Sequence, residues 1–216
     1  MEDNLFEAQY DLTKKSKFKR FYESNKILIY ISVFLLLILF GYLSYFLESK
    51  EKKRIALSEN YVQSKIYLEN GDKQKALDLL KSIIFVNDST YSTLSLFMIL
   101  NQDLINDHNE ISNLFNHLLS NNKYDIEIRN LLVYKKALHD SNYMNESELL
   151  EEIKPLINKD SIWKPYALLL LGDYFMSKKE YSKAKDFYIQ ILSINNLQQD
   201  IYEQTKYQLT YIANVQ

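Results

Sequence analysis

The hydrophobic positions divide the chain into two parts with different patterns. Residues 27–47 read ILIYISVFLLLILFGYLSYFL and contain no charged residue, Asn, Gln or Pro. At a rise of about 1.5 Å per residue, a helix of this length crosses a hydrocarbon core of roughly 30 Å. The run holds fifteen Leu, Ile, Phe and Val residues. Each of these favours insertion by roughly 0.3 to 0.6 kcal/mol at the centre of a bilayer. We expect a transmembrane helix over residues 27–47.

Two other interpretations of this run fit less well. A buried core helix is usually shorter and has a polar stripe, which this run lacks on every side. A cleaved signal peptide has an apolar stretch of about 7–15 residues followed by a site of small residues. Here the charged segment from Glu48 to Arg54 follows instead. We therefore expect the helix to remain in place as an anchor.

The charges beside the span favour a cytoplasmic N-terminus. Six basic residues precede the span and five follow it by residue 65, and the first group is the denser one. Basic residues gather on the cytoplasmic side of a span. We expect residues 1–26 to form a short basic cytoplasmic tail and residues 48–216 to form a domain on the other side. A margin of one charge leaves the opposite orientation open on charge alone.

After Leu57 the apolar residues recur at spacings of three and four, which is typical of amphipathic helices. Only three Gly and two Pro occur in the whole chain, so few positions interrupt a helix. The soluble part is therefore predicted to be all-α. Nothing between Leu47 and Glu69 breaks a helix, and the span should continue into the first helix of the domain.

A helical phrase recurs four times in this domain. Its copies begin at Gly71, Asn106, Asn142 and Lys179. Equivalent positions in these copies are Ala76, Ile111, Leu149 and Ala184. Their separations are 35, 38 and 35 residues, close to the roughly 34 residues of a tetratricopeptide repeat. Such a repeat is a helical hairpin that buries its apolar faces only by stacking on its neighbours. The pattern predicts a solenoid of about four degenerate hairpins.

The four copies differ in how well they fit the repeat. The fourth is the clearest, with the small residues Gly172 and Ala184 where its two helices should cross closely. The middle copies have Ile111 and Leu149 where Ala is expected, so their crossings should be wider. A last helix capped by Asp200 should close the solenoid. Its buried face should consist of Ile201, Thr205, Leu209 and Ile212.

Charge and motifs disfavour nucleic-acid binding and catalysis. Of 26 basic and 28 acidic residues, the part after residue 54 holds 16 and 21, a net charge of −5. This is unlike a nucleic-acid-binding surface. The chain has no cysteine, and hence no disulfide or thiol site. It has no phosphate-binding Gly-rich loop, G-x-S-x-G elbow or H-E-x-x-H motif. We predict no enzymatic activity and no cofactor.

Titratable residues give no second sign of chemistry. The three histidines are His108, His117 and His139, and the first two, nine residues apart, do not share a helical face neatly. We expect solvated or capping side chains and no metal. Carboxylates on amphipathic helices usually lie on solvent-exposed faces. That expectation covers Glu148, Glu151, Glu152, Asp173 and Asp186. A membrane-bound hydrolase remains an alternative and would need a pocket of clustered His, Asp and Glu.

If the domain binds proteins, the outward positions of each first helix should line a concave surface. Our register assigns to this surface Tyr61, Lys65, Leu68, Leu96, Tyr134, Tyr166, Leu169 and Asp173. Aromatic anchors with nearby charges suit protein partners. Packing between repeats is an equally good interpretation of any one of these tyrosines.

Four segments carry a resemblance to a known family. They are LFEAQYDLTKKSKFKRFYESNK before the span, the span itself, ENGDKQKALDLLKSI and LLLLGDYFMSKKEYSKAKDFY. With these the chain resembles the YfgM-like tetratricopeptide-repeat membrane proteins. The resemblance implies a bacterial inner-membrane protein with its repeat domain in the periplasm. It also implies an ancillary subunit of the Sec translocon, in contact with periplasmic chaperones or exported clients. A scaffold for another envelope complex is the alternative.

Overall fold

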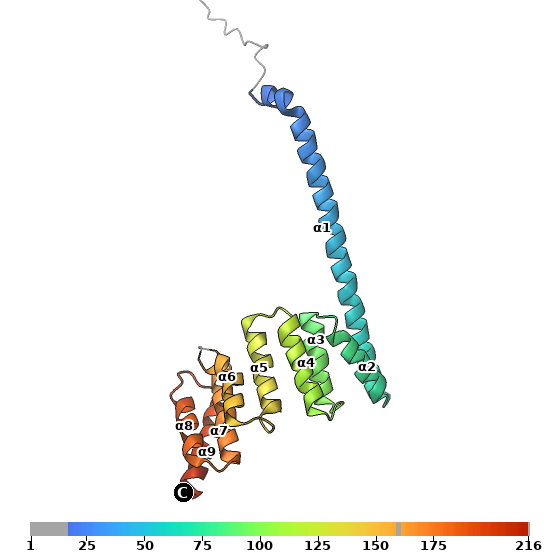
Figure 1. Cartoon of the computed structure of the whole chain (residues 1–216). Helices are drawn as coiled ribbons and strands as arrows, with labels where there is room; N and C mark the ends of the chain where they lie inside the picture. Colours follow the sequence, from blue (N-terminus) through green and yellow to red (C-terminus); the bar gives the residue numbers. More distant parts are fainter. Residues whose placement is uncertain (1–16, 159–160, 216) are drawn as a thin grey trace, which may run out of the picture. The chain divides into compact units, whose positions relative to one another are not determined.

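The computed structural model describes residues 17–158 and 161–215 (Figure 1). Within these ranges the secondary structure is entirely helical, with no strand, which confirms the all-α prediction. The chain divides into two compact units, residues 1–56 and 57–216. Most of the predicted tail, residues 1–16, lies outside the described ranges.

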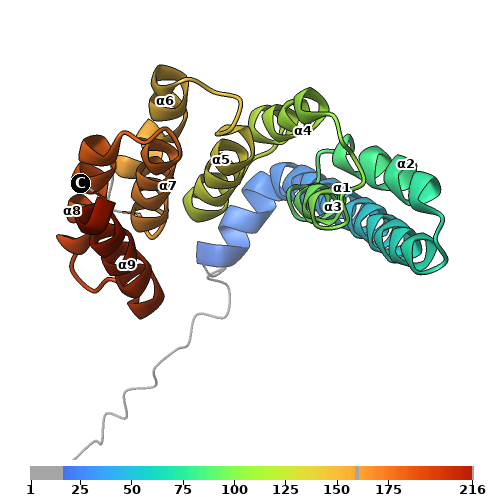
Figure 2. The ribbon, with the colours of Figure 1, turned by 90° about the horizontal axis from the view of Figure 1, so that it is seen from below.

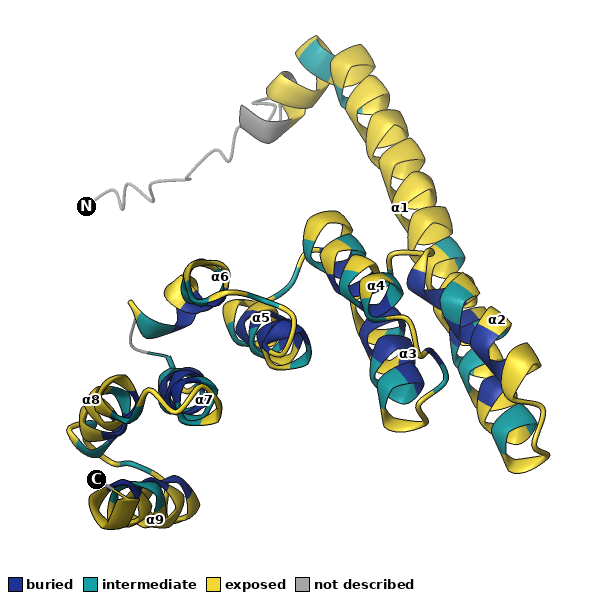
Figure 3. Cartoon of the chain, turned by 60° about the horizontal axis from the view of Figure 1, so that its bottom comes forward, coloured by how far each residue is buried: buried dark blue, intermediate teal, exposed yellow. Residues whose placement is uncertain are grey.

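Helix α1 (Lys17–Glu69) begins within the segment that we predicted as a tail. Its one departure from helical dihedral angles is Asn25, with φ −120° and ψ 16°. From there the helix runs through Glu69 without a break, as the sequence predicted. Its residues over 27–47 are all exposed apart from the half-buried Ile29 (Figure 3). In the described chain it is the one helix long and apolar enough to cross a membrane, with a mean hydropathy of 2.6 over its best window.

The second unit is a row of helical hairpins. After the end of α1 come α2 (Lys73–Ile84), α3 (Ser89–Asn101), α4 (His108–Asn121), α5 (Ile126–Asp140), α6 (Glu146–Ile157), α7 (Lys164–Ser177), α8 (Tyr181–Leu192) and α9 (Gln199–Val215). The end of α1 lies beside α2, and from α2 to α9 each helix packs on the next one in the chain. We take the hairpins as the end of α1 with α2, α3 with α4, α5 with α6, and α7 with α8. Within this unit α3, α5 and α7 lie on the inner side of the row, and α4, α6 and α8 lie on the outer side (Figures 2 and 3).

The hairpin arrangement is compatible with the predicted repeats, and the four positions that we treated as equivalent share one environment. Each lies in the second helix of its hairpin and is buried: Ala76, Ile111, Leu149 and Ala184. The buried face of the last helix is also confirmed, since Ile201, Thr205 and Ile212 are buried and Leu209 packs against the core. The predicted cap is wrong. Helix α9 begins at Gln199, so Asp200 lies in the first turn, where its charge still suits the positive end of the helix dipole.

The buried core consists of two clusters that share α5. One joins α2, α3, α4 and α5, and the other joins α5 to α9. Helix α5 gives Leu132 to the first cluster, and Val133 and Ala137 to the second. This helix therefore contributes to both clusters.

Local capping explains where two of these helices start. The Asp88 carboxylate accepts from the backbone N–H groups of Thr90 (3.0 Å) and Tyr91 (2.9 Å), which starts α3. Asn145 and Glu148 form a reciprocal capping box at the start of α6, with distances of 3.0 and 2.8 Å. Such pairs satisfy N–H groups that have no partner inside the helix.

Candidate protein-binding groove

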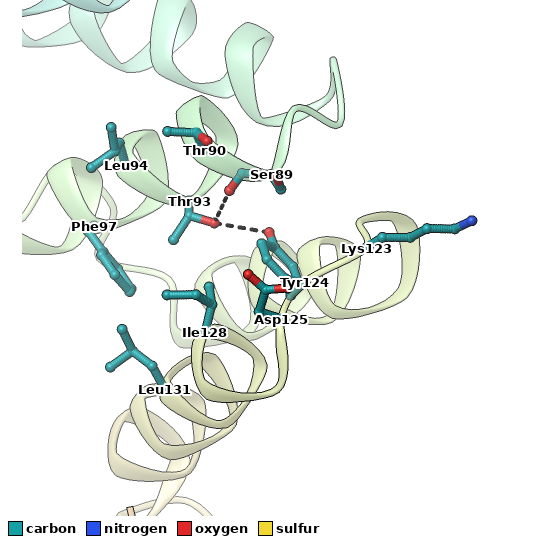
Figure 4. Close-up of a pocket in the computed structure, with 10 residues that line it drawn as sticks. All are labelled: Ser89, Thr90, Thr93, Leu94, Phe97, Lys123, Tyr124, Asp125, Ile128 and Leu131. Carbon is teal, nitrogen blue, oxygen red and sulfur yellow. Dashed lines mark hydrogen bonds between the residues drawn. The ribbon is translucent and has the colours of Figure 1, made fainter. Parts of the chain in front are cut away.

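A groove of about 510 Å³ lies between the first helices of the second and third hairpins (Figure 4). Its walls come from α3 and from the start of α5 with the loop before it. The lining residues are Ser89, Thr90, Thr93, Leu94, Phe97, Lys123, Tyr124, Asp125, Ile128 and Leu131. Its volume lies within the roughly 300–1,000 Å³ that is usual for binding pockets.

Two hydrogen bonds hold one wall of the groove in place. Thr93 donates its hydroxyl proton to the Ser89 carbonyl at 2.8 Å, and the Tyr124 hydroxyl lies 3.0 Å from the same Thr93 oxygen (Figure 4). Because Thr93 has a single proton to give, Tyr124 is the donor in the second bond. Burial raises the pKa of Tyr124, which keeps the phenol neutral and able to donate.

The opposite part of the groove is apolar and open to solvent. Leu94 on α3 is 39% exposed and Ile128 on α5 is 42% exposed. The half-buried Phe97 and Leu131 lie beside them (Figure 4). Contiguous exposed aliphatic and aromatic side chains of this kind mark sites of interaction on a soluble surface. The groove is thus suited to an apolar segment of another molecule.

An aromatic cluster continues the inner side from α5 to α7. Tyr134 stacks on Trp163 with ring centroids 5.8 Å apart, and Tyr166 lies 6.0 Å from Tyr134 and 5.7 Å from Trp163. The Tyr166 hydroxyl donates to the Gln198 side-chain oxygen at 2.8 Å. Burial, then the Asp173 charge, raises the pKa of Tyr134. Two of the predicted surface residues, Tyr134 and Tyr166, are thereby brought together.

The carboxylate of Asp173 is hydrogen-bonded to another residue of the domain. The Tyr188 hydroxyl donates to its Oδ1 at 2.7 Å. Burial raises the pKa of Asp173, and the hydrogen bond from Tyr188 only partly opposes this. The prediction of a fully solvent-exposed side chain is wrong here, because Asp173 is half-buried.

The other predicted surface residues fall into two groups. At the end of α1, Tyr61 lies 6.2 Å from the Tyr91 ring, and the Lys65 ammonium lies 5.2 Å from the Tyr61 ring centroid. Leu68 is half-buried on the same helix. Leu96 and Leu169 are 0% and 7% exposed, so the prediction that they line a surface is wrong. Leu96 lies in the apolar second half of α3 and Leu169 in the apolar run of α7, and helix segments of this kind bury more than one face.

Sequence reasoning missed the groove itself and Trp163. On α3 the segment SLFMIL has no polar stripe that would tell an inner face from an outer one. The predicted register therefore chose Leu96 as the surface residue, whereas Leu94, two positions earlier, lines the groove. Trp163 precedes the first residue of α7 and therefore fell outside a register built on helix positions. Aromatic side chains anchor many protein interfaces, and the single Trp of the chain was a signal that could have been used.

A comparison of this chain with known proteins finds no matching family model, no matching curated protein and no matching solved structure.

Proposed function

We propose that this protein is a membrane-anchored scaffold that binds an apolar segment of a partner protein in the groove between α3 and α5. The observation that carries the proposal is the open apolar wall formed by Leu94, Phe97, Ile128 and Leu131 on consecutive first helices. Grooves on stacked hairpins recognise partners through such side chains. The helix over residues 27–47 is the anchor in this proposal.

The location and the partner follow from the resemblance and from the charge pattern. We propose a YfgM-like protein of a bacterial inner membrane, with a cytoplasmic N-terminus and a periplasmic domain. Its partners are then Sec translocon subunits, periplasmic chaperones or exported clients. The basic residues before the span support this orientation. Another envelope-assembly complex is the alternative partner for the same architecture.

Within the groove itself, the lining residues favour binding over hydrolysis. The residues that line it include no His, Glu or Cys, and the Thr93 hydroxyl bonds Ser89 and Tyr124 rather than the one lining carboxylate, Asp125. A nucleophile needs a base within hydrogen-bond reach. The Thr93 hydroxyl instead donates to the Ser89 carbonyl at 2.8 Å. This arrangement fixes a wall and does not activate a hydroxyl for attack.

Brief crosslinking in cells, followed by mild solubilisation of the full chain and identification of bound proteins, tests the proposal. The paired variant Leu94→Lys with Ile128→Lys places two charges in the groove at positions that are already exposed. We expect capture of the bound protein to fall about tenfold or more, as for loss of interface anchors. Ile189→Lys is the matched control, since Ile189 is 50% exposed on the outer helix α8.

The identity of the captured protein separates the alternatives. Translocon or chaperone subunits that are lost with the paired variant and kept with Ile189→Lys support the export scaffold. A different envelope complex with the same dependence favours the alternative partner. Equal capture by the paired variant and the wild type would sink the groove as the binding site. A copy that lacks residues 55–216 identifies proteins that bind only the anchor.

A further inference from the structure

Two histidines that are 31 residues apart meet at the junction of the second and third hairpins. His108 begins α4, and His139 and Asp140 end α5. The Nδ1 atom of His108 lies 3.1 Å from Nε2 of His139. The Asp140 Oδ1 atom lies 3.6 Å from Nε2 of His108 and 4.0 Å from Nε2 of His139. The prediction of separate, solvated histidines is therefore wrong for this pair.

The Asp140 carboxylate is held so that one oxygen faces the two imidazoles. Its Oδ2 accepts from the Ser112 hydroxyl at 3.0 Å and from the Lys136 ammonium at 3.2 Å. Its Oδ1 is buried and has no hydrogen-bond partner in the part of the chain that the structure describes. Asp140 as a residue is 2% exposed. Leaving a buried carboxylate oxygen unpartnered is costly, so this geometry points to a bound group between Oδ1 and the rings.

The surrounding charges and rings suit a cation at this point. Lys136 also pairs with Glu152 at 2.9 Å, so one ammonium faces two carboxylates and leaves an excess negative charge. The Tyr143 ring stacks on His108 with centroids 3.7 Å apart, which fixes the orientation of that imidazole. In metal sites, the side chains that bind the ion are regularly held in place by hydrogen bonds to neighbouring residues.

We propose that His108, His139 and Asp140 bind one divalent transition-metal ion, with Zn²⁺ as the best fit. Two imidazole nitrogens and one carboxylate oxygen form a common zinc donor set. Their donor atoms lie within 4.8 Å of one another. Zinc–ligand bonds of about 2.0–2.2 Å in a tetrahedron place donors roughly 3.3 Å apart. His108 can offer only one of its two nitrogens, of which Nδ1 now faces His139 and Nε2 faces Asp140, so the donor atoms must close from as much as 4.8 Å when an ion binds.

The fourth coordination position would face solvent. The side chains of His108 and His139 are 19% and 23% exposed, whereas that of Asp140 is 2% exposed. A water molecule can thus complete the site from the outside. The metal would join α4 to α5 and add to the apolar packing and the Ser112–Asp140 hydrogen bond that already link these two hairpins. This site does not depend on the groove proposed above, because none of its residues lines that groove.

The test uses the full chain without a polyhistidine tag, stripped of metal in detergent and titrated with Zn²⁺ and separately with Co²⁺. We expect one ion per chain and, for Co²⁺, the visible absorption of a tetrahedral complex. His108→Ala and His139→Ala should each weaken Zn²⁺ binding by more than about 100-fold, since even outer-shell losses cost about 10–100-fold. His117→Ala is the control, because His117 bonds Asn87 at 2.8 Å and lies outside the cluster.

Three results would overturn the proposal: no stoichiometric binding of either ion, binding that survives His139→Ala, or an equal loss in His117→Ala. Because Asp140 is buried, Asp140→Asn is used only with a check of folding by Trp163 fluorescence. His139→Gln serves as a second, milder variant. It keeps the polar character at a position where the side chain is partly exposed, and it should lose Zn²⁺ binding to the same extent as His139→Ala.

Discussion

Tyr188 fills the space that Gly172 leaves between α7 and α8. A Cβ atom added to Gly172 would lie 2.8 Å from Cδ1 of the Tyr188 ring and closer still to Cε1. The same ring is fully buried, and its hydroxyl donates to Asp173 at 2.7 Å. One residue thus provides the packing of a close helix crossing and the hydrogen bond of a half-buried carboxylate.

Gly172→Ala should destabilise the domain even though Ala favours helices. The gain in helix propensity is about 1 kcal/mol, whereas overpacking of a core costs about 1–3 kcal/mol, and the backbone of α8 cannot move without exposing its core face. Thermal unfolding of the full chain in detergent, followed by Trp163 fluorescence, measures the loss. Gly41→Ala is the control, since an added Cβ there meets nothing within 4 Å. An unchanged or higher midpoint for Gly172→Ala would contradict this explanation.

Asp173 should give the domain a measurable dependence on pH. Burial raises the pKa of its carboxyl above the ordinary value of 3.8. The native state therefore binds this proton more tightly than the unfolded state. The free energy of unfolding then falls as pH rises from about 3.8 through the raised folded pKa.

Asp173→Asn cannot ionise and tests this dependence. Over the same pH window, the unfolding free energy of the variant should increase relative to that of the wild type as pH rises. Asp186→Asn on the exposed face of α8 should show no such change. Denaturant unfolding at a series of pH values provides the comparison, and parallel curves for wild type and Asp173→Asn would refute the assignment.

At the scale of the elements, the sequence predicted which helices exist but not which of their faces are free. The positions of hairpins followed from recurring apolar residues such as Ala76 and Ala184, which are fully buried. Which face of α3 is buried could not be predicted, because Leu94 and Leu96 are chemically alike and only the packing of α3 against α2 and α4 distinguishes them. The pairing of His108 with His139 depends on how two hairpins stack, and sequence spacing does not encode that.

The proposed anchor predicts that helix α1 leaves the membrane only when the cost of added charges exceeds the insertion free energy of its apolar residues. One Arg at the centre of a span costs about 2.5–3.5 kcal/mol, so the paired variant Leu36→Arg with Leu39→Arg removes most of the insertion free energy. We expect the wild type to resist carbonate extraction and the paired variant to be released or degraded. Ile55→Arg with Ile66→Arg is the control, since both side chains are exposed on α1 outside the predicted span. Release of this control to the same extent would count against residues 27–47 as the anchor.

At the scale of the whole molecule, the absence of cysteine makes the proposed topology testable with single introduced thiols. Tyr207→Cys places a thiol at a position that is 70% exposed on α9, and Glu2→Cys places one in the predicted tail. In intact cells with a permeabilised outer membrane, a membrane-impermeant maleimide should label only Tyr207→Cys. Lysis should make Glu2→Cys reactive as well. The reverse pattern would invert the proposed orientation.

Because the core consists of two clusters that share α5, we expect the helices before α5 and the helices after it to unfold separately. Each repeat contacts mainly its neighbours, so loss of order can spread from one end and halt where the packing changes. We expect α7, α8 and α9 to exchange their amide hydrogens as one block, at a rate different from that of α2, α3 and α4. Hydrogen exchange read helix by helix would show this, and uniform protection would contradict it. A protease or an unfoldase that acts from the C-terminus should then pause at α5. Helices α2 to α4 would remain folded after α7 to α9 have unfolded.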